Sequence, residues 1–298
     1  MISMPIVPHL WAASPKANFP RVDWRRKLAG ARRVLVATDF DGTLAEIVPE
    51  PDAATPVPGA QAALTALAAA ASFEVAIVSG RSLADLVARC PVPGAWYLGG
   101  HGNEILPPAR PPSAQEADLT AARNREAAER RGDGPQRVAR LAEELRPMLA
   151  RWPGTWLEVK PWSVGVHYRR APQWESAVLA YAADLAGQRG FRLVPGNCIA
   201  ELLPSTADNK GQALLGLRAR LRCDLAVYFG DEATDEDVFA LADDRLVGVH
   251  VGPPSPAQRD GWDDRPTAAA FWLASPQEVV ACLQCLPACA GQPAAPQP

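Results

Sequence analysis

The sequence predicts an α/β protein whose main part is a doubly wound parallel sheet, interrupted by an inserted α+β unit. Three observations lead to this prediction. Short apolar segments rich in β-branched residues alternate with helical segments, turns containing aspartate, serine or glycine follow the strands, and the alternation breaks off after residue 105 and resumes after residue 204. Strands and helices in short succession are typical of a parallel sheet covered by helices on both faces.

The first part of the chain supplies three strands and two helices of the predicted sheet. Residues 33–38 and 73–78 are continuous apolar runs, as expected of strands that are buried on both faces. Residues 59–71 and 82–90 carry alanine and leucine at helical spacing, and residues 96–100 form the next strand. This part therefore contains two strand-helix units followed by a third strand.

The inserted unit differs in pattern from its surroundings. Residues 107–135 are rich in Pro, Ala, Arg and Glu and lead into a charged amphipathic helix, which indicates a domain boundary. Residues 155–169 are typical of two strands about a Pro-Trp-Ser turn, and a helix near 173–189 and strands near 191–203 complete the unit. We therefore expect flexible ends at 1–24 and 291–298, a discontinuous core domain at 25–105 and 205–290, and a cap domain at 106–204.

Composition excludes several classes of protein. Thirty basic and 33 acidic residues give a formal charge of −3, which offers no general attraction to a polyanion, so we expect no nucleic-acid partner. No apolar run reaches the roughly 18 to 20 residues that cross a bilayer, and the N-terminus has no basic start followed by an apolar stretch. We expect a cytoplasmic protein with no membrane partner; the oligomeric state is open, with a monomer favoured.

Three of the six cysteines form a C-x2-C-x3-C cluster at Cys282, Cys285 and Cys289. Three close thiols are able to bind zinc or iron, but a fourth ligand is missing from the segment. The spacing also fits one face of a terminal helix. We favour reduced thiols that pack as small hydrophobic side chains, and leave metal binding by this cluster open.

Asp39 and Asp41 follow the first strand, in the turn DFDGT. Side chains two apart share a face of a strand, so both carboxylates can reach one site at its end. Two close carboxylates cannot both ionise freely, which leaves a proton on one of them, so that one is able to attack while the other donates. Gly42 permits a tight turn, and Thr43 offers a hydroxyl and backbone N–H groups to a phosphate.

Further polar residues follow the later strands of the same sheet. Ser79 comes after the second strand, Lys210 opens a helix that follows Asn209, and Asp231 and Asp235 follow the strand at 225–230. In open parallel sheets, ligands bind beyond the carboxyl ends of the strands. Serine and lysine are able to hold phosphoryl oxygens, and the added carboxylates complete an oxygen-rich site of the kind that Mg²⁺ prefers.

These four segments resemble the signature motifs of the haloacid dehalogenase superfamily of phosphohydrolases, in the expected order. The resemblance implies a Rossmann-type core, an aspartyl-phosphate on Asp39, and Asp41 as the acid that protonates the leaving oxygen and then activates water. It also implies that Ser79 and Lys210 hold the phosphoryl group. Mg²⁺ would be held by Asp39, the Asp41 backbone carbonyl and Asp231, with Asp235 in support.

Residues 33–240 are further similar to the trehalose-6-phosphate phosphatases, through DFDGTLAEI, SGRS, GGHG, E-x-K-x2-S-x3-H-Y-R and GDEATDEDVF. This resemblance implies a sugar-phosphate substrate, trehalose 6-phosphate, and assigns substrate contacts to a set of residues in both domains. These are Gly80, Arg81, His101, Gly102, Glu158, Lys160, Ser163, His167, Arg169, Asn197 and Glu201. Apart from the resemblance, the charged members of the cap would be interpreted as exposed strand residues in mutual pairs.

The chain departs from the family at Leu203, where the family often has arginine. Any substrate or interdomain contact of that arginine is therefore in doubt. Two alternatives remain: a phosphatase for another sugar phosphate, such as sucrose phosphate or a glucosylglycerol-type phosphate, and a sugar-phosphate sensor without catalysis. The retained Asp39, Asp41, Lys210 and Asp231 favour an enzyme. We expect the cap to close over the core and exclude water during the reaction.

Overall fold

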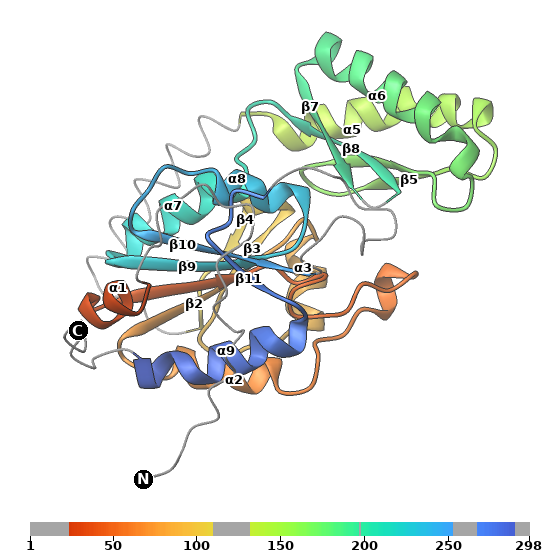
Figure 1. Cartoon of the computed structure of the whole chain (residues 1–298). Helices are drawn as coiled ribbons and strands as arrows, with labels where there is room; N and C mark the ends of the chain where they lie inside the picture. The colour runs from red at the N-terminus through yellow and green to blue at the C-terminus, as the bar shows by residue number, and fades with distance from the viewer. Residues whose placement is uncertain (1–23, 110–131, 197, 253–266, 290–298) are drawn as a thin grey trace.

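The computed structural model of the chain describes residues 24–109, 132–196, 198–252 and 267–289 (Figure 1). These residues form two sheets, one of seven strands and one of four. The smaller sheet is built from the segment between the fourth and ninth strands of the chain, so the expected insertion into an α/β core is present. The domain boundaries themselves stay a prediction.

The large sheet has the strand order β11-β10-β9-β1-β2-β3-β4. Every neighbouring pair is parallel except β3 and β4, which are antiparallel. The short edge strand β4 was not predicted from the sequence, because it is only three residues long. The strands are β1 Val34–Thr38, β2 Phe73–Val78, β3 Trp96–Gly99, β4 Glu104–Leu106, β9 Leu225–Gly230, β10 Leu246–Val251 and β11 Phe271–Leu273.

Helices cover both faces of this sheet, as a doubly wound fold requires (Figure 1). Successive side chains of a strand point to opposite faces, so Val34 and Val36 pack in one apolar cluster while Leu35 and Ala37 pack in another. The first cluster includes residues of α1 Trp24–Gly30, α2 Ala60–Ala68, α3 Leu83–Arg89 and α9 Pro276–Cys289. The second includes residues of α7 Lys210–Leu221 and α8 Glu236–Phe239.

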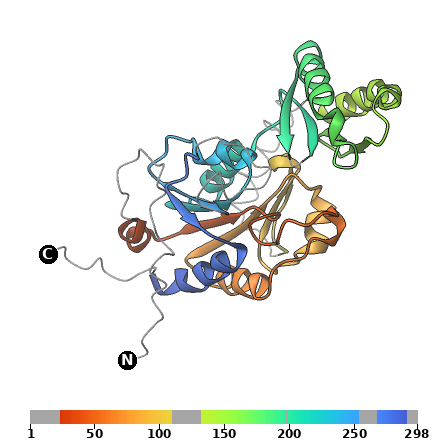
Figure 2. The ribbon, with the colours of Figure 1, turned by 45° about the vertical axis from the view of Figure 1, so that its right-hand side comes forward.

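The small sheet is antiparallel, with the order β5-β6-β8-β7. Its helices lie on one face, the face away from the core, and we call this unit the cap (Figure 2). An apolar cluster that includes Val138, Val166 and Val178 fills the space between sheet and helices. The elements are α5 Gly134–Leu145, β5 Trp156–Val159, β6 Val164–His167, α6 Glu175–Arg189, β7 Phe191–Gly196 and β8 Ile199–Pro204.

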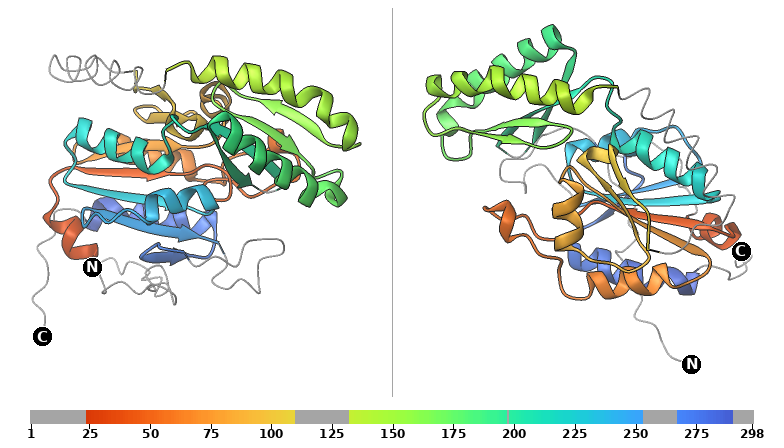
Figure 3. Two further views of the ribbon diagram at one scale, coloured as in Figure 1. Left: turned by 90° about the horizontal axis from the view of Figure 1, so that it is seen from above. Right: turned by 180° about the vertical axis from the view of Figure 1, so that it is seen from behind.

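The other face of the cap sheet looks onto the core and leaves a cavity of about 800 Å³ between the two units. Figure 3 shows the cap seated over one end of the core sheet rather than over either of its helical faces. Residues that follow β1, β2, β3 and β9 line the cavity, as do residues of the cap strands. The cavity thus lies at the carboxyl ends of the parallel strands. Among the described helices, none has the length and apolar character needed to cross a bilayer.

Candidate active site

Asp39 is held at the end of β1 by the neighbouring strand. Its N–H donates to the carbonyl of Phe229 on β9 at 2.8 Å, so the hydrogen-bond ladder continues one residue past the end of β1. Gly42 has a φ of 73°, in the left-handed region, and a Cβ built there would overlap the Asp231 carboxylate. The Thr43 hydroxyl donates to Asp231 Oδ1 at 2.8 Å. The DFDGT turn and the turn after β9 are therefore packed directly against one another.

Lys210 is the first residue of α7 and is fully buried. Asn209 caps the helix in a reciprocal box with Gln212, which sets where the helix starts. The ammonium then donates to three carboxylates, Asp39 Oδ2 at 2.8 Å, Glu232 Oε1 at 2.9 Å and Asp235 Oδ1 at 2.9 Å. Burial alone would lower the pKa of Lys210, but these carboxylates raise it well above its ordinary value.

Asp235 orders the turn that follows β9. Its Oδ2 accepts the N–H groups of Asp231 and Glu232, both at 2.9 Å, and its Oδ1 accepts the Tyr228 hydroxyl at 2.6 Å as well as the Lys210 ammonium. Asp235 is completely buried. Because both of its oxygens accept hydrogen bonds, this carboxylate fixes the position of Lys210 relative to the backbone of residues 231–235, which we call the acidic turn.

Asp39, Asp231 and Asp235 form an acidic trio whose oxygens lie within 4.8 Å of one another. Burial raises the pKa of Asp39. The Lys210 ammonium acts against this rise, and the carboxylates of Asp235 and Glu232 add to it. Burial also raises the pKa of Asp231, reinforced by Asp39, Asp235 and Glu232. An oxygen-only donor set with this mutual repulsion fits a hard divalent cation. Within the described residues no other group of ligating side chains meets this geometry.

Glu232 was not among the predicted site residues, although it lies within the GDE sequence. Its side chain accepts from Lys210 and from the Thr234 hydroxyl. Burial would raise the pKa of Glu232, but Lys210 and then Thr234 lower it to about 2. Its position directly after Asp231 was the available signal, but position alone does not show whether the side chain turns toward Lys210.

Asp41 lies outside the acidic trio, and its side chain contacts Arg81 instead. Arg81 Nε donates to Asp41 Oδ2 at 2.6 Å and Arg81 Nη2 donates to Asp41 Oδ1 at 2.7 Å. Ser79, at the end of β2, is buried and accepts the N–H of Arg81 at 3.2 Å. Asp39, Asp41, Ser79 and Arg81 all line the cavity, so the motifs after β1 and β2 converge there.

His101 connects the core to the cap. It lies in the GGHG segment after β3 with a left-handed φ of 58°, held by its N–H donating to the Ser79 carbonyl at 2.9 Å. His101 Nε2 lies 3.1 Å from Glu201 Oε2 on β8. A Cβ on Gly80 would lie 2.6 Å from the His101 ring, and Gly102 packs against Ala213 of α7. The two glycines therefore make room for the histidine and for the helix.

Glu201 accepts hydrogen bonds from polar side chains of the cap. Its Oε1 accepts from the Ser163 hydroxyl at 2.6 Å and from the Lys160 ammonium at 3.0 Å, in addition to the His101 contact at Oε2. Burial would raise the pKa of Glu201, but Lys160, His101 and Ser163 hold it well below its ordinary value. Glu201 is therefore a buried carboxylate that stays ionised.

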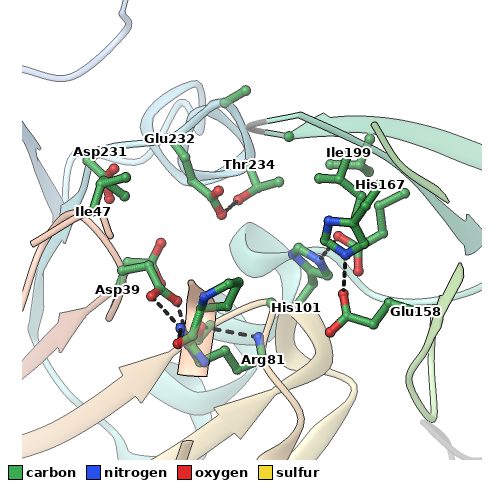
Figure 4. Close-up of a pocket in the computed structure, with 18 of the residues that line it drawn as sticks. Asp39, Ile47, Arg81, His101, Glu158, His167, Ile199, Asp231, Glu232 and Thr234 are labelled. Atoms are coloured by element: carbon green, nitrogen blue, oxygen red, sulfur yellow. Dashed lines mark hydrogen bonds and ion pairs between the residues drawn. The ribbon is translucent and has the colours of Figure 1, made fainter. Parts of the chain in front are cut away.

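Glu158 and His167 form a second polar pair on the cap sheet, joined at 3.0 Å between Oε2 and Nε2. Burial would raise the pKa of Glu158, but His167 and Lys160 lower it. Trp156 stacks on His167 with ring centroids 4.5 Å apart and planes within 1°. This stack was not predicted from the sequence. Figure 4 shows Asp39, Asp231 and Glu232 toward one side of the cavity, Glu158 and His167 toward the other, and His101 between them.

The structure brings most of the predicted substrate-binding residues to the cavity. Its lining includes Gly80, Arg81, His101, Glu158, Lys160, His167, Arg169 and Glu201. Ser163 and Gly102 are buried beside it, in contact with Glu201 and α7 respectively. Asn197 lies outside the described residues.

Two further sequence features have a structural outcome. Leu203 is fully buried on β8, and its neighbour across the β7–β8 ladder is Arg192, which lies 3.6 Å from Asp237 of α8. An interdomain arginine contact is thus made from the adjacent strand. Cys282 is buried in the core cluster and Cys285 is half-buried, whereas the Cys289 side chain lies outside the described residues. The preference for packed thiols over a metal site at this cluster stays a prediction.

Solved structures with the same fold include sugar-phosphate phosphatases. The C-terminal domain of Candida albicans trehalose-6-phosphate phosphatase superposes with a TM-score of 0.67 at 20% identity, over 92% of this chain and 98% of that chain. The sucrose-phosphatase of Synechocystis, solved with sucrose and phosphate, gives a TM-score of 0.52 at 18% identity, over 87% and 98%. At these identities the likeness concerns the fold, and it confirms the predicted fold class.

Sequence comparison finds relatives with higher sequence identity than these structures. The trehalose-phosphate phosphatase of Mycobacterium marinum is 40% identical over 253 residues, which are 83% of this chain and 60% of that protein. The Mycobacterium tuberculosis protein of the same name is 38% identical over 255 residues, 84% of this chain and 60% of that protein. The chain thus spans about 60% of the length of these relatives. A family model described as trehalose-phosphatase matches residues 37–277, and the chain therefore belongs to the trehalose-phosphatase family.

Proposed function

We propose that the protein hydrolyses trehalose 6-phosphate to trehalose and inorganic phosphate with Mg²⁺ as cofactor. The observation that carries this proposal is the assembly of Asp39, Lys210 and the acidic turn at one end of a cavity whose other end is lined by polar cap residues. One end suits a phosphoryl group, and the other suits sugar hydroxyls. The names of the relatives support the choice of sugar.

In this reaction Asp39 attacks phosphorus, a bond from its carboxylate oxygen to phosphorus forms, and the bond from phosphorus to the sugar oxygen breaks. Asp41, in its protonated form and with one oxygen released from Arg81, gives its proton to the departing sugar oxygen. In the second step Asp41 takes a proton from water, the water oxygen attacks phosphorus, and Asp39 is released with inorganic phosphate. Lys210 contacts the Asp39 carboxylate and is placed to balance negative charge as it builds on the phosphoryl oxygens.

The acidic trio fits Mg²⁺ better than a softer metal, because all of its donors are carboxylate oxygens. Bound there, the cation would neutralise phosphoryl charge and relieve the repulsion that raises the pKa of Asp39 and of Asp231. Asp39 and Asp231 are the side chains proposed to hold it, together with the Asp41 backbone carbonyl. Asp235 supports them through the backbone of the acidic turn.

The cap supplies the proposed sugar contacts. Glu158, Lys160 and Glu201 present charged groups to the cavity, and each is held by a neighbouring side chain. A sugar that lacks the matching hydroxyl would leave such a buried group unpaired, which costs about 1–3 kcal/mol. This gives selectivity for one disaccharide over other sugar phosphates.

Because the five described cysteines are thiols rather than disulfides, we also propose a reducing, cytoplasmic setting.

The test is phosphate release from trehalose 6-phosphate with and without Mg²⁺, beside sucrose 6-phosphate and glucose 6-phosphate. We expect release from trehalose 6-phosphate in the presence of Mg²⁺ and loss of release in Asp39→Asn. Faster release from sucrose 6-phosphate would assign a different sugar. Binding of trehalose 6-phosphate without release under any metal condition would support a sensor and contradict the proposed activity.

A further inference from the structure

Asp41 is held by a chain of side chains that extends away from the cavity. The Arg81 guanidinium engages both Asp41 oxygens, at 2.6 and 2.7 Å, in the two-pronged geometry that fixes a carboxylate in one orientation. The same guanidinium lies over the Phe40 ring, 5.4 Å from its centroid. Only 11% of the Arg81 side chain is exposed. The orientation of Asp41 therefore depends on where Arg81 is held.

Asp85 holds Arg81 from the opposite side. Arg81 Nη1 donates to Asp85 Oδ2 at 2.7 Å, and Arg89 Nε donates to Asp85 Oδ1 at 2.8 Å. Asp85 lies in the first turn of α3, where the Ser82 hydroxyl accepts its N–H and anchors the helix start. Asp85 is thus clamped between two arginines, one of which contacts Asp41.

The loop before α2 completes this arrangement. Arg81 Nη2 donates to the Pro51 carbonyl at 2.8 Å, and Arg89 Nη1 donates to the Asp52 carbonyl at 2.7 Å. Each of the three guanidinium nitrogens of Arg81 therefore has an acceptor, and these acceptors come from three separate segments of the core. A guanidinium with its donors used in this way is better suited to holding a side chain than to binding a new ligand.

We propose that Asp85 is a positioning residue for the reaction, which it serves by fixing Arg81 and through Arg81 the Asp41 carboxylate. This inference rests on the proposed function, because it assigns Asp41 the transfer of a proton to the leaving oxygen. Asp85 contacts neither the acidic trio nor Lys210 among its described hydrogen bonds. Its removal should therefore disturb proton transfer to the leaving group and leave phosphoryl binding intact.

The leaving group separates these two effects. A sugar oxygen departs as an alcohol and needs the proton, whereas p-nitrophenolate departs as a stable anion and does not. Because Asp41 also activates water in the second step, which is the same for both substrates, the comparison uses kcat/KM, which reports only the steps up to departure of the leaving group. Asp85→Asn should lower kcat/KM for trehalose 6-phosphate by about 10- to 100-fold. For p-nitrophenyl phosphate the same variant should keep kcat/KM within about threefold of the wild-type value. An equal fall for both substrates, or no fall for either, would overturn the proposal.

Asp243 offers a matched control. It also bridges two arginines, Arg218 and Arg245, but it lies before β10, at the amino end of the parallel strands. Asp243→Asn should leave the ratio of the two kcat/KM values unchanged. If Asp85→Asn does not fold, Arg81→Lys tests the same series of contacts, because a lysine cannot hold Asp41 and Asp85 together. The same dependence on the leaving group is expected for this variant. A wild-type enzyme inactive on trehalose 6-phosphate would refute the proposed function, and the comparison would then use the sugar phosphate that is hydrolysed.

Discussion

His101 of the core and Glu201 of the cap are joined by a contact of 3.1 Å between Nε2 and Oε2, and both side chains are buried. His101 lies in the turn that follows β3 of the large sheet, Glu201 lies on β8 of the small sheet, and the two are 100 positions apart in the chain. On the cap side the same carboxylate also accepts from Lys160 and Ser163. The interdomain contact and the proposed sugar-binding residues thus share one charged group.

Glu201→Gln should lower the free energy of unfolding by about 3 kcal/mol, because it leaves Lys160 with a weakened set of buried partners. The pKa of Glu201 is lower in the folded chain than its ordinary 4.5. Its contribution to stability is therefore fully present above about pH 4.5 and is lost as the pH falls through the lower folded value. Urea unfolding at several pH values measures this, and the variant should show a weaker dependence on acid.

Glu143→Gln is the control for Glu201→Gln. Glu143 is an exposed residue of α5 paired with Arg146 at 3.1 Å, so its replacement should change stability by less than about 0.5 kcal/mol. A similar loss in both variants would show that the buried contacts of Glu201 have no special weight.

Asp231→Asn should stabilise the protein in the absence of divalent cations and remove its response to them. Burial and the carboxylates of Asp39 and Asp235 raise the pKa of Asp231, so its charge is unfavourable without a cation. Thermal unfolding in EDTA should show a rise of a few degrees, corresponding to roughly 1 kcal/mol. Added Mg²⁺ should raise the midpoint of the wild type but not that of the variant. Asp184→Asn, on the exposed side of α6, should behave as the wild type in both conditions.

Gly42→Ala should abolish phosphate release and weaken Mg²⁺ binding. The backbone at Gly42 is left-handed, and an added Cβ would overlap the Asp231 carboxylate, so that carboxylate has to move. Calorimetric titration with Mg²⁺ measures the binding directly. Gly187→Ala is the matched control, since nothing lies within 4 Å of its Cβ in α6, and it should stabilise the helix by about 0.5–1 kcal/mol. Normal Mg²⁺ binding by Gly42→Ala would refute the packing that we describe.

Cys90 and Cys223 should resist alkylation at pH 8, whereas Cys285 should react first among these three. Burial raises the pKa of both buried thiols to about 12, from an ordinary value of 9.0. The reactive thiolate is then about a thousandfold rarer than for an ordinary thiol at the same pH. Peptide mass spectrometry after a short treatment with iodoacetamide gives the order of labelling. Early labelling of Cys90 in the folded protein would contradict the burial of that side chain.

The sequence alone determined that Asp39, Ser79 and Asp231 follow the ends of strands and that Lys210 opens a helix. This was predictable because apolar runs identify buried strands, and parallel strands direct their carboxyl ends to one edge of the sheet. The order of the motifs then led to the phosphohydrolase resemblance, and family membership is confirmed. Short or irregular features, such as the antiparallel strand β4, carried too weak a pattern to be predicted.

Only the tertiary structure decided which side chains contact one another within that edge. Arg81 was expected to bind substrate, yet its donors engage Asp41 and Asp85, and the half-buried Glu232 accepts from Lys210. Most of the contacts at this edge join residues far apart in the chain: Arg81 and Asp41 are 40 positions apart, and Lys210 lies 22 positions from Glu232 and 171 from Asp39. Periodicity reports which face of an element is buried, but the partner of a buried charge is set by the packing of the elements, because a charge is stable in the interior only where an opposite group meets it.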